Sequence, residues 1–316
     1  MTRPRRYPTR LGCLLLCLAV GHTIRSETVT LTSAADTSLV ESAPDNNLGG
    51  EPFVPAGVTQ NRTRAHGLFR FDFTGQIPPQ ATVLSATLVL QVTGQPSAGY
   101  MAAAFDLHRL LKPWGEGTNT AQFSNHPGIG APATTNDATW NMRFAFTTNA
   151  WTVPGASPTN DYAPAISAQQ FVYDVGNSPY VFGPTPSLTA DVQAWVDHPD
   201  SNFGWLLMAD DETANFTARR FGSREDPNNA PQLTVEFIPP LRLLTPRLAG
   251  GRFSFTFPAA AGQTGTVEFC TTLAGSDWTA LTNFVGSATA TNLVVSDPIL
   301  GPQRFYRVVT TNAAGP

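Results

Sequence analysis

The chain has 316 residues and a formal net charge of −4, and only 13% of its residues are charged. That length suffices for two domains with cores of their own, and the acidic balance argues against nucleic acid as a partner. Gly, Pro, Thr, Ser and Asn are plentiful, whereas Lys112 is the only lysine. Such a composition is typical of many short strands joined by turns.

Residues 1–21 have the features of a secretory signal peptide. Four arginines precede an apolar run at residues 11–20, and small residues follow where signal peptidase needs them. The run is about half the length that a helix needs to span a bilayer. We therefore expect a secreted protein without a membrane span. Removing four arginines changes the net charge from −4 to −8 and leaves Cys270 as the only cysteine, which excludes an internal disulfide.

Residues 27–238 repeatedly alternate apolar and polar side chains with a period of two. Two runs show it best, with apolar faces formed by Phe69, Phe71 and Phe73 and by Ala86, Leu88, Leu90 and Val92. Further strands are predicted at 203–208, 216–221 and 232–238, with turn clusters at 44–47, 125–128 and 226–229. This pattern predicts an antiparallel all-β domain, for which a sandwich is the commonest architecture. Long loops are expected in the least regular stretch, 94–187.

One stretch has a helical period instead. Val192, Trp195 and Val196 stand at i, i+3 and i+4, with Ser187 or Thr189 as candidate N-caps. The spacing predicts a short helix over 189–197 that covers one end of the sandwich. We expect Trp195 to lie in the core.

The paired prolines at 239–240 predict a linker, after which the alternation starts afresh. Phe253, Phe255 and Phe257 form one apolar face, and Val267 and Phe269 another. Residues 241–316 are therefore expected to form a second, small β-sandwich domain.

Eleven segments, in this order over about 210 residues, resemble the DNRLRE domain, which is also grouped as carbohydrate-binding module family 96 and is related to disaggregatase-type proteins. They are ADT (35–37), PDNNLG (44–49), LFRFD (68–72), IPPQATVLSATL (77–88), WGEG (114–117), ATWN (138–141), WTVPG (151–155), LTADVQAWV (188–196), NFGWLL (202–207), FGSRE (221–225) and APQL (230–233). The resemblance implies a secreted jelly-roll β-sandwich that binds polysaccharide or belongs to a cell-surface protein, usually without catalysis.

The C-terminal region carries a second resemblance. The segments TVEFCTTL (266–273), WTAL (278–281) and RFYRV (304–308) resemble a small fibronectin- or immunoglobulin-like β-module of secreted bacterial proteins. This implies an accessory domain, in which we interpret Cys270 as an inert buried thiol.

No catalytic motif accompanies these features. The sequence has no G-x-S-x-G and no H-E-x-x-H, and its histidines lack metal-ligand spacing. The carboxylates of 210–212 and 225–226 are candidates for a glycosidase pair, but turn residues surround both, which favours solvated turn carboxylates. We expect a non-enzymatic protein. The alternative is a glycan-cleaving enzyme with an acid pair in the loops of 94–187.

Sugar binding needs flat aromatic surface and nearby polar groups. The sequence offers Trp114, Trp151 and Tyr162 in its loop-rich region as candidate stacking residues, although Trp114 can equally be a packing anchor. The densest basic cluster, Arg219, Arg220 and Arg224, could bind uronate or sulfate groups, with pairing to local carboxylates as the alternative. Alternation places Arg219 and Arg220 on opposite faces.

Hard oxygen ligands stand near the start of the predicted domain. Asp36, Asp45, Asn46 and Asp72 are candidate ligands of a structural calcium ion. Hydrogen bonding within Asx turns explains residues 45–47 equally well.

Together these observations predict a secreted, monomeric protein that binds an extracellular polysaccharide, with an anionic one among the candidates. A cell-surface or matrix structural protein, such as an adhesin, is the alternative.

Overall fold

The computed structural model describes residues 26–121, 127–240, 243–259, 262–272, 277–287, 291–301 and 303–311. The predicted signal peptide lies outside these residues. The chain forms two compact units that divide between Pro240 and Leu241. Within the described part of the chain, no helix is long and apolar enough to cross a membrane.

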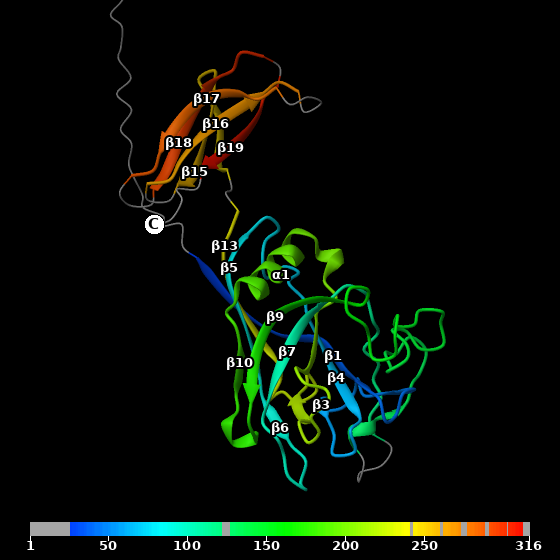
Figure 1. Ribbon diagram of the computed structural model, residues 1–316. Coiled ribbons are helices and arrows are strands. Elements are labelled where there is room, and N and C mark those ends of the chain that lie inside the picture. The colour runs from blue at the N-terminus through cyan, green and yellow to red at the C-terminus, as the bar shows by residue number, and fades with distance from the viewer. Residues whose placement is uncertain are drawn as a thin grey trace, which may run out of the picture. The chain divides into compact units, whose positions relative to one another are not determined.

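The first unit is built on one large antiparallel sheet, in the order β10-β5-β13-β1-β4-β11-β7-β9, with β3, β6 and β12 attached beside it (Figure 1). Its strands are β1 (Glu27–Val40), β3 (Phe53–Val58), β4 (Arg64–Phe71), β5 (Thr82–Leu90), β6 (Val92–Gly94), β7 (Ala103–Leu110), β9 (Tyr162–Val172), β10 (Tyr180–Phe182), β11 (Trp205–Ala209), β12 (Arg219–Gly222) and β13 (Gln232–Ile238). A separate short pair joins β2 (Asn46–Asn47) to β8 (Ala131–Pro132). The predicted antiparallel all-β class is confirmed.

Strand β1 takes part in both halves of this sheet. Its first half, Glu27 to Thr32, pairs with β13, and its second half, Ser33 to Val40, pairs with β4. An irregularity between Ser33 and Ala35 separates the two registers, as a β-bulge does when a strand bends.

The inward side chains of all these strands form one apolar core. Phe69, Phe71 and Phe73 lie in it, as their alternation predicts, and so do Ala86, Leu88, Leu90 and Val92. The Trp195 and Trp205 rings meet edge to face at 4.5 Å near its centre. Trp195 is buried, as expected, and Trp205 donates its indole N–H to the buried Asp191 carboxylate at 2.9 Å.

The α-helix of the described chain, α1 (Pro186–Asp197), lies against β5 (Figure 1). The predicted start at Thr189 was one turn too late, and neither Ser187 nor Thr189 is the N-cap. Thr185 accepts a hydrogen bond from the Leu188 N–H and Pro186 occupies the first helical position, a combination that favours helix initiation. Short 3₁₀ helices are present at Pro127–Ile129, Val175–Asn177 and Pro199–Ser201.

The loops between β7 and β9 cover part of the outer side of the sheet. Leu68, Leu110 and Leu206 project from the strands, and Trp114, Trp140 and Trp151 pack on them from the loops. This second apolar cluster explains how a segment with little regular structure is held in place.

The second unit contains two three-stranded antiparallel sheets. One has the order β14-β15-β18 and the other β17-β16-β19, with β14 (Leu244–Ala249), β15 (Arg252–Ala259), β16 (Thr264–Cys270), β17 (Thr279–Val285), β18 (Thr291–Pro298) and β19 (Phe305–Thr311). Phe255, Phe257 and Val267 are central in its core, and Cys270 is a free, buried cysteine.

Candidate functional site

The loops between β7 and β9 cover only part of the outer face formed by β4, β11, β7 and β9. Beyond these loops, the face carries polar side chains. The register sets Met208 of β11 beside Asp106 of β7, and Asp106 beside Gln169 of β9. Directly opposed residues of antiparallel strands share one face. These three side chains therefore form one row across three neighbouring strands.

Asp106 lies at the floor of this row. It is only 5% exposed and accepts a hydrogen bond from Gln169 Nε2 at 2.8 Å. Burial raises the pKa of Asp106, and the neighbouring Asp210 carboxyl raises it further, while the Gln169 hydrogen bond opposes both. Two carboxyl groups thus lie together on the outer face.

The next row contains an exposed aromatic residue. The Asp210 N–H donates to the Ala104 carbonyl, and Ala104 is the register partner of Phe171. Phe171 is 45% exposed, and its ring lies 5.0 Å from that of Tyr173, which is 50% exposed. Since strands are about 4.8 Å apart, Asp210 and Phe171 stand about 10 Å apart across the small side chain of Ala104.

We call Asp106, Gln169, Phe171, Tyr173 and Asp210 the outer-face patch. It combines exposed ring surface with carboxyl and amide groups, which is the combination that sugar recognition requires. Neither Phe171 nor Tyr173 was singled out from the sequence. The alternation of Gln169, Phe171 and Tyr173 was a usable signal, but only the register with β7 and β11 brings the carboxyl groups beside them.

Arg219 lies behind this patch and does not present its charge to solvent. It is 1% exposed, and its guanidinium donates to the carbonyls of Met101 and Tyr173, among others. Its Cζ lies 5.0 Å from the centre of the Tyr100 ring. Desolvation lowers the pKa of Arg219. The predicted role in binding uronate or sulfate therefore does not fit Arg219.

Arg220 and Arg224 lie apart from Arg219. As alternation predicts, Arg220 faces away from Arg219, and its Cζ lies 4.5 Å from the centre of the Phe53 ring. Arg224 forms ion pairs with Glu116 at 2.6 Å and with Glu225 at 3.0 Å. This arrangement matches the alternative of local carboxylate pairing for Arg224. The three arginines do not form one basic site.

The predicted stacking residues are buried. Trp114 and Trp151 are 3% and 4% exposed, and their indole N–H groups donate to the carbonyls of Phe203 and Thr139. Tyr162 is also buried and packs against the His108 ring, with centroids 5.0 Å apart. Stacking needs an accessible ring face, so these three residues do not offer the surface that we expected from the sequence. They anchor the loops.

The four candidate calcium ligands are not assembled into a site. Asp36 is buried and accepts the Arg224 N–H, Asp45 accepts the Asn141 amide, Asn46 donates to the Ile129 carbonyl, and Asp72 accepts the Thr74 N–H. Burial raises the pKa of Asp36 to about 7. No group of three or more acidic, His or Cys side chains in the described part of the chain is placed to hold a metal ion. The residues therefore do not fit the candidate calcium site, and Asp45 and Asp72 take part in local hydrogen bonds instead.

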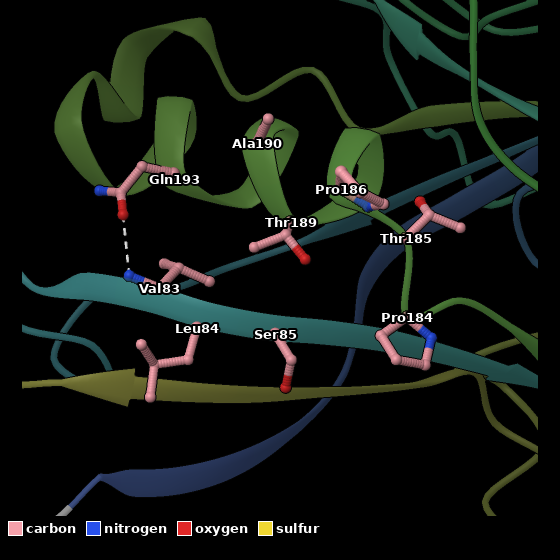
Figure 2. Close-up of a pocket in the computed structure, with 9 residues that line it drawn as sticks. All are labelled: Val83, Leu84, Ser85, Pro184, Thr185, Pro186, Thr189, Ala190 and Gln193. Carbon is pink, nitrogen blue, oxygen red and sulfur yellow. Dashed lines mark hydrogen bonds between the residues drawn. The ribbon is translucent and has the colours of Figure 1, made fainter. Parts of the chain in front are cut away.

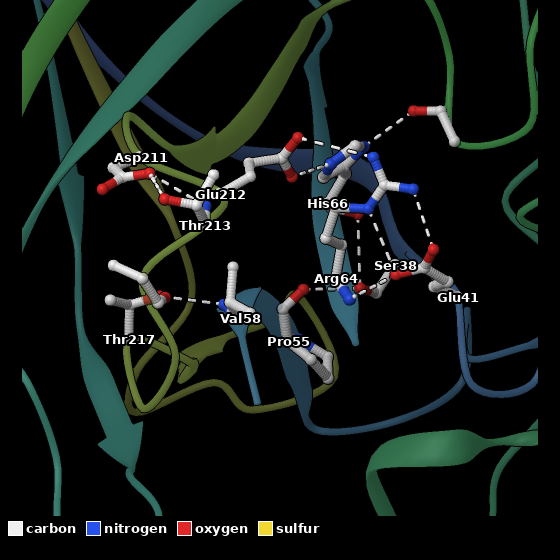
Figure 3. Close-up of polar contacts among 12 residues, drawn as sticks. Ser38, Glu41, Pro55, Val58, Arg64, His66, Asp211, Glu212, Thr213 and Thr217 are labelled. Atoms are coloured by element: carbon white, nitrogen blue, oxygen red, sulfur yellow. Dashed lines mark hydrogen bonds and ion pairs between the residues drawn. The ribbon is translucent and has the colours of Figure 1, made fainter. Parts of the chain in front are cut away.

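A polar cluster lies at the β4 end of the same outer face (Figure 3). His66 is buried, with its Nε2 2.6 Å from Glu212 Oε1 and its Nδ1 2.7 Å from the Gly155 carbonyl. Arg64 forms two side-chain hydrogen bonds with Glu41, at 2.8 and 3.1 Å, and these lower the pKa of Glu41. Both ring nitrogens of His66 are thus engaged, and the cluster ties two loops to β4.

Other carboxylates of the loops are used in the same structural way. Asp161 accepts four hydrogen bonds from Thr152 and Ser157, and Asp137 accepts from Thr134 and Asn119. Carboxylates that accept hydrogen bonds from nearby loop residues in this way stabilise the loops.

A shallow groove of about 640 Å³ lies between β5 and α1 (Figure 2). Leu84 and Ser85 line one side and Pro184, Thr189 and Gln193 the other. Gln193 accepts a hydrogen bond from the Val83 N–H at 2.8 Å. The lining contains no charged residue and no aromatic ring, so it offers little to recognise a sugar.

No protein-family model and no curated protein matches this chain.

Proposed function

We propose that this chain is a secreted, non-catalytic polysaccharide-binding protein that recognises its ligand at the outer-face patch. In this proposal the first unit is a jelly-roll β-sandwich of the DNRLRE type, and the second is a fibronectin- or immunoglobulin-like accessory domain.

One observation carries the proposal. Phe171 and Tyr173 expose about half of their surfaces on the same sheet face as Gln169, Asp106 and Asp210. Exposed aromatic side chains that gather on a folded surface are typical of binding sites. The ring faces can stack on a pyranose, and the amide and carboxyl groups can hydrogen-bond to its hydroxyls.

The placement of the acids supports binding without turnover. Asp106 is 5% exposed and is held by a hydrogen bond from Gln169, whereas a glycosidase needs two carboxyl groups that both reach the substrate, about 5 to 10 Å apart. Asp211 and Asp226, candidates from the sequence, accept hydrogen bonds from the Thr213 and Asn228 N–H groups. These two acids are turn carboxylates.

A cell-surface structural or adhesin role is the second candidate. It is favoured by the exposed apolar side chains of the second unit, which include Leu248, Val285 and Leu300. Such side chains are suited to contact with another macromolecule. This function predicts no soluble glycan ligand and firm association with the cell envelope.

The deciding experiment is a glycan array with residues 22–316, covering neutral, amino-bearing and acidic polysaccharides, with and without EDTA. Every hit is then assayed for released reducing ends and unsaturated products. Saturable binding without product is the expected result. Product release would show an enzyme, absence of all binding would favour the structural role, and loss of binding in EDTA would show a metal requirement that the described residues do not explain.

Two variants locate the site. Phe171→Ala and Tyr173→Ala should each weaken glycan binding about tenfold, because each removes stacking surface worth about 1.4 kcal/mol. Phe146→Ala is the matched control, since Phe146 is also an exposed aromatic residue but belongs to the loops between β7 and β9. If all three variants bind like the wild type, the ligand does not use the outer-face patch.

A further inference from the structure

The charged groups beside the exposed rings of the outer-face patch are mainly acidic, and the buried His108 is the side chain whose positive charge opposes the raised pKa of Asp106. Asp210 is exposed, and Asp174 is half-buried beside Tyr173, where it accepts the Tyr100 hydroxyl at 2.8 Å. Arg219, which donates to the Tyr173 carbonyl, is buried with its donors turned to backbone carbonyls. Arg64, at the other end of the sheet face, is paired with Glu41.

This distribution disfavours an acidic glycan. A uronate or sulfate at the patch would add a negative charge beside Asp106 and Asp210. No guanidinium of the residues just named is free to neutralise it. Like charges at close range repel, and the repulsion is strongest where burial lowers the local dielectric constant. The anionic polysaccharide among our expectations from the sequence is therefore the poorer fit.

We propose that the outer-face patch binds a polysaccharide whose sugar rings carry free amino groups, such as a polymer of glucosamine. This inference rests on the proposed function and adds the chemical class of the ligand. A protonated amine is attracted to Asp210 and Asp106, and the ring that bears it stacks on Phe171.

Three features of the geometry support this ligand. First, Asp210 is exposed and follows Met208, the register partner of Asp106, by two residues, so an ammonium group that pairs with Asp210 also lies close to a second carboxyl group. Second, only the small side chain of Ala104 separates Asp210 from Phe171, so a sugar ring can approach the sheet there. Third, an ammonium group near the Phe171 or Tyr173 ring gains a cation–π attraction.

The test compares soluble glucosamine oligosaccharides with their N-acetylated counterparts, which differ only in the amine. Binding is measured by calorimetry in weakly acidic buffer, where the amines are protonated. We expect the free amine to bind about tenfold more tightly, as a charge-assisted hydrogen bond provides. Raising the salt concentration should reduce that preference.

Asp210→Asn should abolish most of the amine preference, because it weakens binding of the free amine by a much larger factor than binding of the acetylated oligosaccharide. Asp72→Asn is the matched control, because Asp72 is an exposed aspartate in an Asx turn outside the patch, which asparagine also forms. Asp210 is exposed, so its variant is expected to fold, and a thermal melt checks this.

Each outcome has a separate meaning. A preference lost in Asp210→Asn and kept in Asp72→Asn supports the inference. Equal binding of both oligosaccharides, or tighter binding of a uronate, overturns the inference but leaves polysaccharide binding intact. If neither these oligosaccharides nor any glycan of the array binds, the proposed function itself fails.

Discussion

The two units use the same alternation of side chains and reach different degrees of burial. In the first, nearly every inward residue of the sheet lies in one core, because α1 and opposing strands cover it. In the second, the fully buried core is small, and strand residues such as Leu248 and Val285 remain 70% exposed. Alternation therefore predicts which side a residue takes, whereas the amount of covering structure decides how far it is buried.

The largest effect should come from the centre of the first core. Trp205→Ala removes a fully buried ring that packs on Trp195 and leaves Asp191 without its indole donor. We expect the free energy of unfolding of the first unit to fall by about 5 kcal/mol. Urea denaturation followed by near-UV circular dichroism measures this. If the second unit loses the same amount of stability, the two units unfold together. The difference in burial between them would then not correspond to a difference in their free energies of unfolding.

A second large effect should depend on pH and be confined to the first unit. Burial raises the pKa of Asp36 from 3.8 to about 7, so between these values the folded state keeps a proton that the unfolded state has lost. Stability should fall as pH rises through that window and level off above it. Asp36 should account for on the order of 4 kcal/mol of this change.

The test is Asp36→Asn, which removes that titration. Burial also raises the pKa of Asp106, Glu116 and Asp191, and these groups act in the same direction. The informative quantity is therefore the difference between wild type and variant, measured by urea denaturation on both sides of the window. Identical pH profiles would show that Asp36 is not desolvated as its burial indicates.

The smallest of the three effects belongs to the second unit. Phe257→Ala should cost about 3 kcal/mol, because Phe257 is fully buried and packs against Phe284 at 5.0 Å. Leu248→Thr is its control and should change the free energy of unfolding by less than about 0.5 kcal/mol. A larger loss from Leu248→Thr would mean that this side chain is covered in solution.

Much of the fold follows from local pattern. The phenylalanines at 69, 71 and 73 and the burial of Trp195 were predictable because period and residue type act over a few positions. The start of α1 was misjudged because Thr185 and Pro186 lie before the first periodic residue. The order of the strands in the large sheet is not local, since it depends on pairings between strands far apart in sequence.

The candidate site was much harder to predict. Tryptophans in loops suggest stacking platforms, yet Trp114 and Trp151 are buried because the loops fold back over Leu68 and Leu206. From the sequence, Arg219 is expected to be an exposed cation, and only the structure shows that backbone carbonyls surround its guanidinium. The outer-face patch depends on the register between strands β7, β9 and β11. Residue types alone do not encode that register.

Strand β1 has a consequence for how the first unit forms. Its opening residues pair with β13, about 200 positions later in the chain, so the sheet cannot close until the end of the unit has been synthesised. Pairings of such high contact order fold slowly. Until β13 has been synthesised, the apolar strands of the emerging chain lack a pairing partner. During this time their exposed edges are prone to aggregate with other chains.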